Sequence, residues 1–245
     1  MIKILAKLMG LMLLAYVVLF AFVWQVRDFS YLILHDFLEE NPVIERKEEV
    51  DAMLNNFESV ALKDLDHHYK TVSKIADPAY AKMHQRAKFH LINSCDAYRY
   101  IAGNIRIRDV LSRDEFYAAS IMDRSKPIYW RIDKRILYKI LELRTALAQN
   151  GYEKEGFEVR HGYRTPKHNE RVGGASKSRH IMGEAVDMVI SDVNKDGKYT
   201  DEDKQIVLDV LERSVINNQG GIGKYPGTRT VHMDVRGHRA RWDDY

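Results

Sequence analysis

The chain has 245 residues, of which 45% are hydrophobic and 30% charged, and its formal net charge is +3. This length accommodates one ordinary domain together with additional helical material. The near balance of charge gives no sign of the concentrated basic face that nucleic-acid binding needs, so we expect no nucleic-acid partner. A single cysteine, Cys95, excludes an internal disulfide. That fits either a reducing compartment or an exported protein that avoids disulfides.

An uninterrupted apolar segment, LMGLMLLAYVVLFAFVW, occupies residues 8–24 and contains no charged side chain. As a helix it spans about 25 Å, enough to cross a bilayer with slight help from its flanks. Lys3 and Lys7 precede it, which favours a cytoplasmic N-terminus and a chain body on the extracytoplasmic side. A cleaved signal peptide is the alternative, but no small-x-small cleavage site follows Trp24. We therefore predict that residues 1–27 form an uncleaved, single-pass signal anchor in the cytoplasmic membrane.

Residues 28–130 are predicted to form a helical, membrane-proximal region. Apolar periodicity favours a charged helix over residues 45–76 and a second helix over residues 80–101, with a break at Asp77–Pro78. A further helix is expected to begin near Ser112, in an S-x-x-E pattern. The region either recruits a protein partner or serves as a solvated stalk.

The residue pattern changes near residue 130, and we expect residues 131–245 to form a compact α+β domain. Residues 133–149 carry a broad apolar helical face, and Asn150–Gly151 is a typical helix end. Four short segments have the alternation or the composition of strands, and a helix is expected over residues 203–213. The predicted strands are residues 157–161, 184–190, 220–223 and 230–235. The fold class is therefore a small antiparallel sheet with flanking helices.

The most informative segment is S-x-H-x-x-G-x-A-x-D at residues 178–187, followed by V-H-M-D at residues 231–234. His180, Asp187 and His232 supply the nitrogen and oxygen ligands that catalytic zinc sites use, with a fourth position left for water. A lone histidine is more often a structural residue than a ligand. Three ligand-type residues within matched motifs instead indicate a zinc site.

Strand geometry predicts the surroundings of these ligands. Gly183 allows the chain to turn before the strand that carries Asp187. Residues two apart on a strand face the same way, so Asp234 is expected beside His232. There Asp234 either accepts a proton from the activated water or orients the ligand histidine. Glu184 is expected to point away from Asp187 and to be exposed.

Further motifs surround the zinc motif. In chain order they are H-G-Y-R-T-P-K-H-N at residues 161–169, V-G-G-A at 172–175, G-G-I-G-K-Y-P at 220–226, and the Arg-Trp pair at 241–242. With these motifs, residues 133–242 resemble the D-alanyl-D-alanine carboxypeptidase family of zinc peptidases, within it the branch of bacterial murein endopeptidases. The resemblance implies a DD-peptidase/hedgehog-like zinc domain, and it does not cover the anchor or the helical region.

The resemblance also implies a mechanism. Zinc on the three ligands lowers the pKa of its water and polarises the scissile carbonyl. Arg164, in the G-Y-R segment, stabilises the oxyanion, and a structural salt bridge is the alternative role for this side chain. Ser178 and Tyr163 are candidate substrate-binding residues. Ser178 alternatively holds the loop that precedes His180.

One position departs from the family pattern. Some members carry a catalytic Glu or Asp three residues before the last histidine ligand, where this chain has Arg229. Arginine cannot act as a base, although the branch with the V-H-x-D ending also lacks that acid. Asp234 is the leading candidate for the catalytic base, and His238 and Glu184 are weaker ones.

A second metal motif, DVNKDGKYTDED, occupies residues 192–203. It matches the EF-hand calcium loop, with an Asp at the last position as in dockerin modules. The predicted structural calcium ligands are Asp192, Asn194, Asp196, Lys198 and Asp203. The alternative is a solvated acidic turn in which Thr200 caps the following helix. Because the loop follows the strand that carries Asp187, calcium loss is expected to loosen the zinc site.

These features predict a membrane-anchored zinc metallopeptidase on the periplasmic side of the membrane. Its expected substrate is peptidoglycan, in which it hydrolyses an amide bond of the stem peptides or cross-links. Endopeptidase and D-Ala carboxypeptidase activities share the zinc core, and both remain open. The alternative from a different class is a catalytically weak, zinc-containing peptidoglycan-binding module.

Overall fold

The computed structural model describes Met12 and residues 42–243. Apart from Met12, the predicted anchor over residues 1–27 lies outside the described residues, as does the segment 28–41. Within the described part of the chain, no helix combines the length and the apolar character needed to span a membrane. A compact unit begins at Val43.

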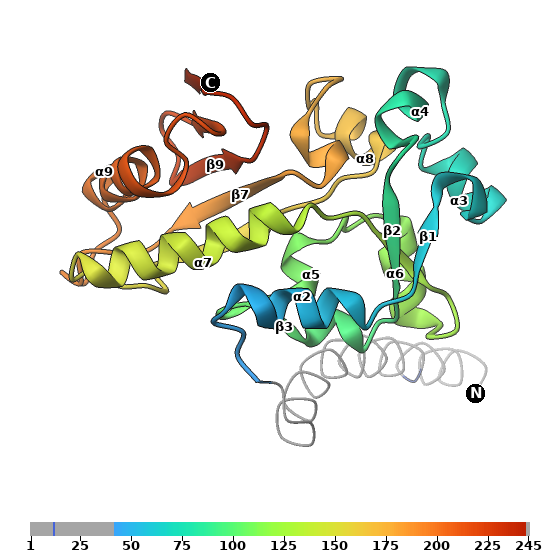
Figure 1. Cartoon of the computed structure of the whole chain (residues 1–245), viewed down its shortest axis with the longest axis horizontal. Helices are drawn as coiled ribbons and strands as arrows, with labels where there is room; N and C mark the ends of the chain where they lie inside the picture. Colours follow the sequence, from blue (N-terminus) through green and yellow to red (C-terminus); the bar gives the residue numbers. More distant parts are fainter. Residues whose placement is uncertain (1–11, 13–41, 244–245) are drawn as a thin grey trace, which may run out of the picture. The chain divides into compact units, whose positions relative to one another are not determined.

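The first half of this unit mixes short helices with small antiparallel sheets (Figure 1). Its helices are α2 (Lys47–Asn55), α3 (His67–Val72), α4 (Pro78–His84), α5 (Ile107–Val110) and α6 (Glu115–Met122), with the helical turns η1 (Leu62–Asp64) and η2 (Asp96–Tyr98). Strands β1 (Ser59–Ala61), β2 (Lys88–Ile92) and β5 (Ile128–Trp130) form a sheet in the order β1-β2-β5. Strands β3 (Tyr100–Ala102) and β4 (Ile105–Arg106) pair separately.

The prediction of long, continuous helices over residues 45–76 and 80–101 is wrong. The first gives way to β1 and α3, and the second ends at His84 before β2. Strand β2 is paired on both sides, and its Phe89 is fully buried, so sheet pairing outweighs the helical spacing of the sequence. Asp114, not Ser112, is the N-cap of α6, accepting hydrogen bonds from two backbone amides.

Helix α7 (Lys134–Gln149) joins the two halves of the unit (Figure 1). Asp133 caps its start, and, as predicted, Gly151 follows its end, with φ of +80°. Its buried leucines and isoleucines each contribute roughly 1.5–3 kcal/mol by leaving water. The helix packs against α9 and η4 on one side and against α2 and β3 on the other.

The boundary expected near residue 130 does not separate two bodies. Arg144 on α7 is 2% exposed, and its Nη1 donates to Asn104 Oδ1 at 2.7 Å. Its Nη2 lies 3.3 Å from Glu45 Oε1. The buried guanidinium therefore ties α7 to the first residues of the unit, and residues on both sides of position 130 share one hydrophobic core.

The second half is built on a five-stranded sheet in the order β10-β8-β9-β7-β6. Its elements are β6 (Phe157–His161), α8 (Pro166–Arg171), η3 (Arg179–Met182), β7 (Ala185–Ile190), α9 (Asp201–Val210), η4 (Leu211–Val215), β8 (Gly221–Lys224), β9 (Thr230–Asp234) and β10 (Ala240–Asp243). Strands β6, β7, β8 and β9 pair antiparallel, while β10 runs parallel to β8. The mixed α+β class is confirmed, and β10 is a strand that the sequence did not predict.

One cross-strand row on this sheet positions the candidate site. The register pairs His161 with Asp187, Asp187 with His232, His232 with Gly223, and Gly223 with Trp242. Directly paired residues on neighbouring strands place their side chains on the same face. The row therefore carries two of the predicted zinc ligands at its centre, an imidazole at one end and an indole at the other.

Candidate metal centre

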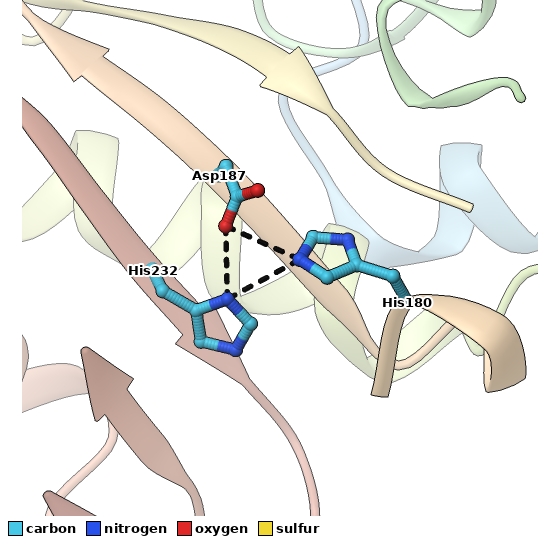
Figure 2. Close-up of side chains that lie close together, drawn as sticks. All are labelled: His180, Asp187 and His232. Carbon is cyan, nitrogen blue, oxygen red and sulfur yellow. Dashed lines mark hydrogen bonds and ion pairs between the residues drawn. The ribbon is translucent and has the colours of Figure 1, made fainter. Parts of the chain in front are cut away.

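The three predicted zinc ligands lie together on the sheet (Figure 2). Asp187 on β7 places its Oδ1 2.9 Å from His232 Nδ1 on β9 and 3.2 Å from His180 Nε2 on η3. The two histidine nitrogens are 3.3 Å apart. All three side chains are buried. Within residues 42–243, only these three residues form a group of carboxylate, imidazole or thiol side chains close enough to share a metal ion.

The backbone around His180 fixes its ring. Its Nδ1 lies 2.6 Å from the Gly162 carbonyl oxygen, so Nδ1 carries the proton and Nε2 offers its lone pair to the cluster. Gly183 ends η3 in the left-handed conformation, with φ of +68°. A Cβ at that position would lie 2.4 Å from the Arg131 carbonyl oxygen, so only glycine fits this turn into β7.

Asp234 holds the other side of the His232 ring. Its side chain is fully buried, and Oδ2 lies 3.2 Å from His232 Nε2, away from the nitrogen that faces the cluster. Arg236 Nε donates to Asp234 Oδ1 at 2.9 Å, and the Gly221 amide donates to the same oxygen at 3.0 Å. With its oxygens engaged in this way, Asp234 is placed to orient His232, one of the two roles expected for it.

Charge within the cluster is arranged for cation binding. Burial lowers the pKa of His180, which keeps this imidazole neutral. Burial works to raise the pKa of Asp187, but the two histidines outweigh it and hold that carboxyl well below its usual range. Burial likewise works to lower the pKa of His232, and hydrogen bonds to Asp187 and Asp234 reverse the effect.

Arg164 contacts the cluster from the loop after β6. Its Nη2 lies 2.5 Å from Asp187 Oδ2, and its side chain is 12% exposed. The salt bridge offered as an alternative role is therefore present, and it places the guanidinium beside the ligand carboxylate. This position is compatible with a second role in stabilising negative charge on a substrate.

His161 is a neighbour of the cluster to which the sequence assigned no role. A bulge in β6 between Val159 and His161 shifts the register, so that His161 rather than Arg160 stands opposite Asp187. His161 Nδ1 lies 3.7 Å from Asp187 Oδ2, and half of the side chain is exposed. Burial and the charge of Arg164 lower the pKa of His161 to about 4. Alternation along the strand gives no signal of such a bulge.

The structure corrects the substrate-binding role expected for Tyr163. This side chain is 1% exposed and belongs to the hydrophobic core, so it cannot contact a substrate. Burial raises the pKa of its phenol well above the usual range. Ser178 begins η3, where its carbonyl oxygen accepts from the Ile181 amide at 3.2 Å. Its side chain caps no backbone group of that turn, and the residue is half-buried.

Neither of the two weaker base candidates belongs to the cluster. Glu184 was expected to be exposed, but its side chain is 18% exposed and forms an ion pair with Arg179 at 3.0 Å. His238 is exposed in the connection between β9 and β10. Arg229 stacks on Tyr199, with its guanidinium carbon 4.9 Å from the ring centroid.

Several carboxylates of the loop at residues 192–203 accept hydrogen bonds from backbone amides of the same loop. Asp203 is 1% exposed and accepts from the backbone amides of Val193, Asn194 and Thr200. Thr200 is the N-cap of α9 in a capping box with Asp203, as the capped-turn alternative predicted. Asp192 accepts from the Asp196 and Gly197 amides at 3.0 and 2.8 Å.

Comparison with protein families points to the same part of the chain. Residues 143–234 match the family model described as Peptidase M15. The matched segment begins within α7 and ends with β9, so it contains all three residues of the cluster and leaves β10 outside. The match supports the M15 zinc peptidase family, which includes D-Ala-D-Ala carboxypeptidases. No curated protein matches the chain.

The donor set of the cluster fits the zinc on which M15 peptidases depend. Two imidazole nitrogens and one carboxylate oxygen are the ligands of catalytic zinc sites that retain an open position. Each histidine has its second nitrogen bound, by the Gly162 carbonyl or by Asp234. Such outer contacts fix the tautomer and the orientation of ligand histidines. The chain therefore carries a zinc-peptidase-type site.

Proposed function

We propose that this protein is a membrane-anchored zinc metallopeptidase that hydrolyses an amide bond in peptidoglycan stem peptides or cross-links. The observation that carries the proposal is the convergence of His180, Asp187 and His232 inside the segment that matches Peptidase M15. A hydrophobic N-terminal segment preceded by lysines supports a site on the extracytoplasmic side. Peptidoglycan, the expected substrate, lies in that compartment.

Each residue of the site has a task in this reaction. Zinc, when bound, supplies Lewis acidity and lowers the pKa of water. His180 and His232 offer their cluster-facing nitrogens, held in place by Gly162 and Asp234. Arg164 lies beside the cluster with little exposure, where its charge stabilises a developing oxyanion more strongly than it would in water.

The test is digestion of purified muropeptides, cross-linked and uncross-linked, by the full-length protein loaded with zinc. Mass spectrometry of the products identifies the bond that is cleaved. His180→Ala should abolish cleavage, whereas the matched control His67→Ala should leave it unchanged, because His67 is exposed on α3. Equal cleavage by the wild type and His180→Ala would refute the zinc peptidase.

A second candidate function is a zinc-containing module that binds peptidoglycan with little turnover. It is favoured by Asp234, which is fully buried and engaged by Arg236, and by Arg229 at the position where some members of the zinc peptidase family carry an acid. Peptide binding without product, by a protein that contains one equivalent of zinc, would support the module. Turnover that depends on His180 would exclude it.

We also propose that calcium occupies the loop at residues 192–203 and stabilises the connection from β7 to α9. Support comes from the motif, which places oxygen-bearing side chains at Asp192, Asn194, Asp196 and Asp203 within twelve residues. Calorimetric titration of the metal-free protein with calcium should show one site. If the folded protein shows no heat of calcium binding, the loop is a capped turn and not a calcium site.

Two further proposals concern the N-terminal part of the chain. Residues 1–27 anchor the protein in the inner membrane as an uncleaved segment, and residues 28–130 contribute a surface for a protein partner. Fractionation should place the intact chain with the membranes, accessible to protease only from the periplasmic side. Recovery of a shortened chain in the soluble periplasmic fraction would show instead that the segment is cleaved.

A further inference from the structure

The strand β10 lies beyond the segment that matches the family model, yet it reaches the metal centre through one side chain. Trp242 is paired in register with Gly223, which is paired with His232. All three positions therefore share the face of the sheet that carries the cluster. The indole ring centroid lies 5.0 Å from that of His232, at an interplanar angle of 57°.

Gly223 makes this contact possible. A Cβ at that position would lie 2.6 Å from Trp242 Cε2 and 2.7 Å from Cζ2. Real Cβ contacts do not approach so closely, so the indole occupies the space that a side chain on β8 would fill. The small residue between the two strands allows Trp242 to pack against the ligand histidine.

Arg236 connects Trp242 to the same histidine by a second route. Its guanidinium carbon lies 5.0 Å from the indole centroid, in the range of cation–π contacts. The same guanidinium binds Asp234, with Nη2 at 2.5 Å and Nε at 3.0 Å from Oδ2. Asp234 Oδ2 lies in turn 3.2 Å from His232 Nε2. Trp242, Arg236, Asp234 and His232 thus form a closed ring of contacts.

Together these contacts restrain both the face and the edge of the His232 ring. The terminal torsion of histidine is broad, so a ring without such contacts would sample orientations in which Nδ1 leaves the cluster. In the structure Nδ1 points at Asp187 Oδ1 at 2.9 Å. The indole packs against the ring at a tilt of 57°, and Asp234 contacts the nitrogen opposite Nδ1.

We infer that Trp242 is a positioning residue of the metal centre, and that β10 completes a zinc site whose three ligands all precede it. Trp242 acts through His232 and touches neither metal nor substrate. The inference rests on the proposed zinc site, and it extends the functional unit past the matched residues 143–234 to the end of β10.

The primary test measures the zinc affinity of full-length Trp242→Ala by competition with a chromogenic chelator. Loss of a partner that orients a ligand typically costs 10–100-fold in metal affinity, and we expect a loss of about 10-fold or more. Tyr100→Ala is the matched control, since Tyr100 is an aromatic residue on a strand, stacked by Arg106 at 4.3 Å, on a separate sheet. The control should keep wild-type affinity.

Two readouts separate positioning from general stability. Absorption of the cobalt-substituted protein should show an altered ligand field in Trp242→Ala at a temperature well below its Tm. In the wild type, cobalt should also quench indole fluorescence, and Trp242→Phe should remove most of that quenching. The other two tryptophans of the chain, Trp24 and the buried Trp130 on β5, provide the residual signal.

A reverse test covers the case in which Trp242→Ala does not fold. Gly223→Ala should displace the indole and weaken zinc binding in the same way, and it should add no further loss when Trp242 is already alanine. Unchanged affinity and an unchanged cobalt spectrum in folded Trp242→Ala or Gly223→Ala would overturn the inference while leaving the zinc site standing. A wild-type protein that binds no zinc would overturn both.

Discussion

The two metal motifs of this chain lead to different kinds of local structure. The zinc motif draws its side chains from three separate elements, and their ligand atoms converge within 4.8 Å. The loop at residues 192–203 draws its side chains from twelve consecutive positions, and its carboxylates accept hydrogen bonds mainly from the amides of the same loop. Both patterns match their motifs well in sequence.

The difference lies in what holds each carboxylate. Asp187 is held by the side chains of His180, His232, Arg164 and His161, on a sheet whose register fixes the strand residues among them. Asp203 lies next to free amides at the start of a helix, and short acidic side chains bond such amides readily. A sheet can therefore hold a ligand carboxylate for a cation, while a loop offers its carboxylates an alternative partner in its own backbone.

The largest effect is expected from Asp187→Asn, which removes the anionic ligand at nearly constant volume. Changes in outer contacts alone cost 10–100-fold in affinity, so loss of a direct ligand should weaken zinc binding by more than about 100-fold. Cleavage of muropeptides should fall below detection. Chelator competition measures the affinity, and a variant that retains wild-type zinc affinity would remove Asp187 from the ligand set.

The sequence predicted the zinc cluster because its ligands lie in short motifs on strands with a clear pattern. Strands β6, β7, β8 and β9 and helix α7 were predicted to within about two residues at each end. Strand β2 was not predicted, because it is stabilised by pairing with β1 and β5, which lie about thirty to forty residues away in the sequence. Burial of the Tyr163 ring depends on the packing of the whole core, which no local pattern reports.

The surroundings of His232 show the same limit. Alternation along β9 correctly placed Asp234 on the side of His232, but not the partners that bind it. Arg236 and the Gly221 amide donate hydrogen bonds to the Asp234 carboxylate. Trp242 lies on β10, which runs parallel to β8. The contacts of Trp242 depend on register between strands, so the sequence motifs contain Asp234 and Trp242 but do not show how these side chains contact His232.

Asp234→Asn should produce the next largest effect. The amide keeps the shape of the side chain but loses the charge that binds Arg236 and orients His232. We expect zinc affinity to fall about 10–100-fold, with turnover recovered in large part when zinc is present in excess. Steady-state assays over a zinc titration test this. Turnover that stays lost at full zinc occupancy would instead identify Asp234 as the base.

Asp203→Asn should reduce stability in the absence of calcium. The substitution disrupts the capping box at Thr200 and leaves buried amides poorly paired, at a cost of about 1–2 kcal/mol in the free energy of unfolding. Urea unfolding in the presence of a calcium chelator measures it. A zinc affinity that falls in parallel would show that the loop and the zinc site are coupled.

The pH dependence of this variant has a defined sign. Burial works to raise the pKa of Asp203, but backbone amides outweigh it and lower the pKa below its ordinary value. The stabilisation is therefore present above the unfolded-state pKa of about 3.9 and is lost as pH falls through the folded-state value. The stability difference between wild type and Asp203→Asn should shrink below about pH 4, and a difference that grew on acidification would contradict this assignment.

The smallest effect is expected from Asp196→Asn measured without calcium. Asp196 is exposed and accepts only the nearby Lys198 amide, at 2.8 Å, so its loss should change the free energy of unfolding by less than about 0.5 kcal/mol. With calcium at about 100 times its dissociation constant, the wild type should gain about 2.7 kcal/mol, and the variant should lose most of that gain. Thermal unfolding of both proteins, with and without calcium, measures the four values. If calcium stabilises neither protein, the loop functions through its own hydrogen bonds, and the contrast with the zinc cluster becomes one between a metal site and a helix cap.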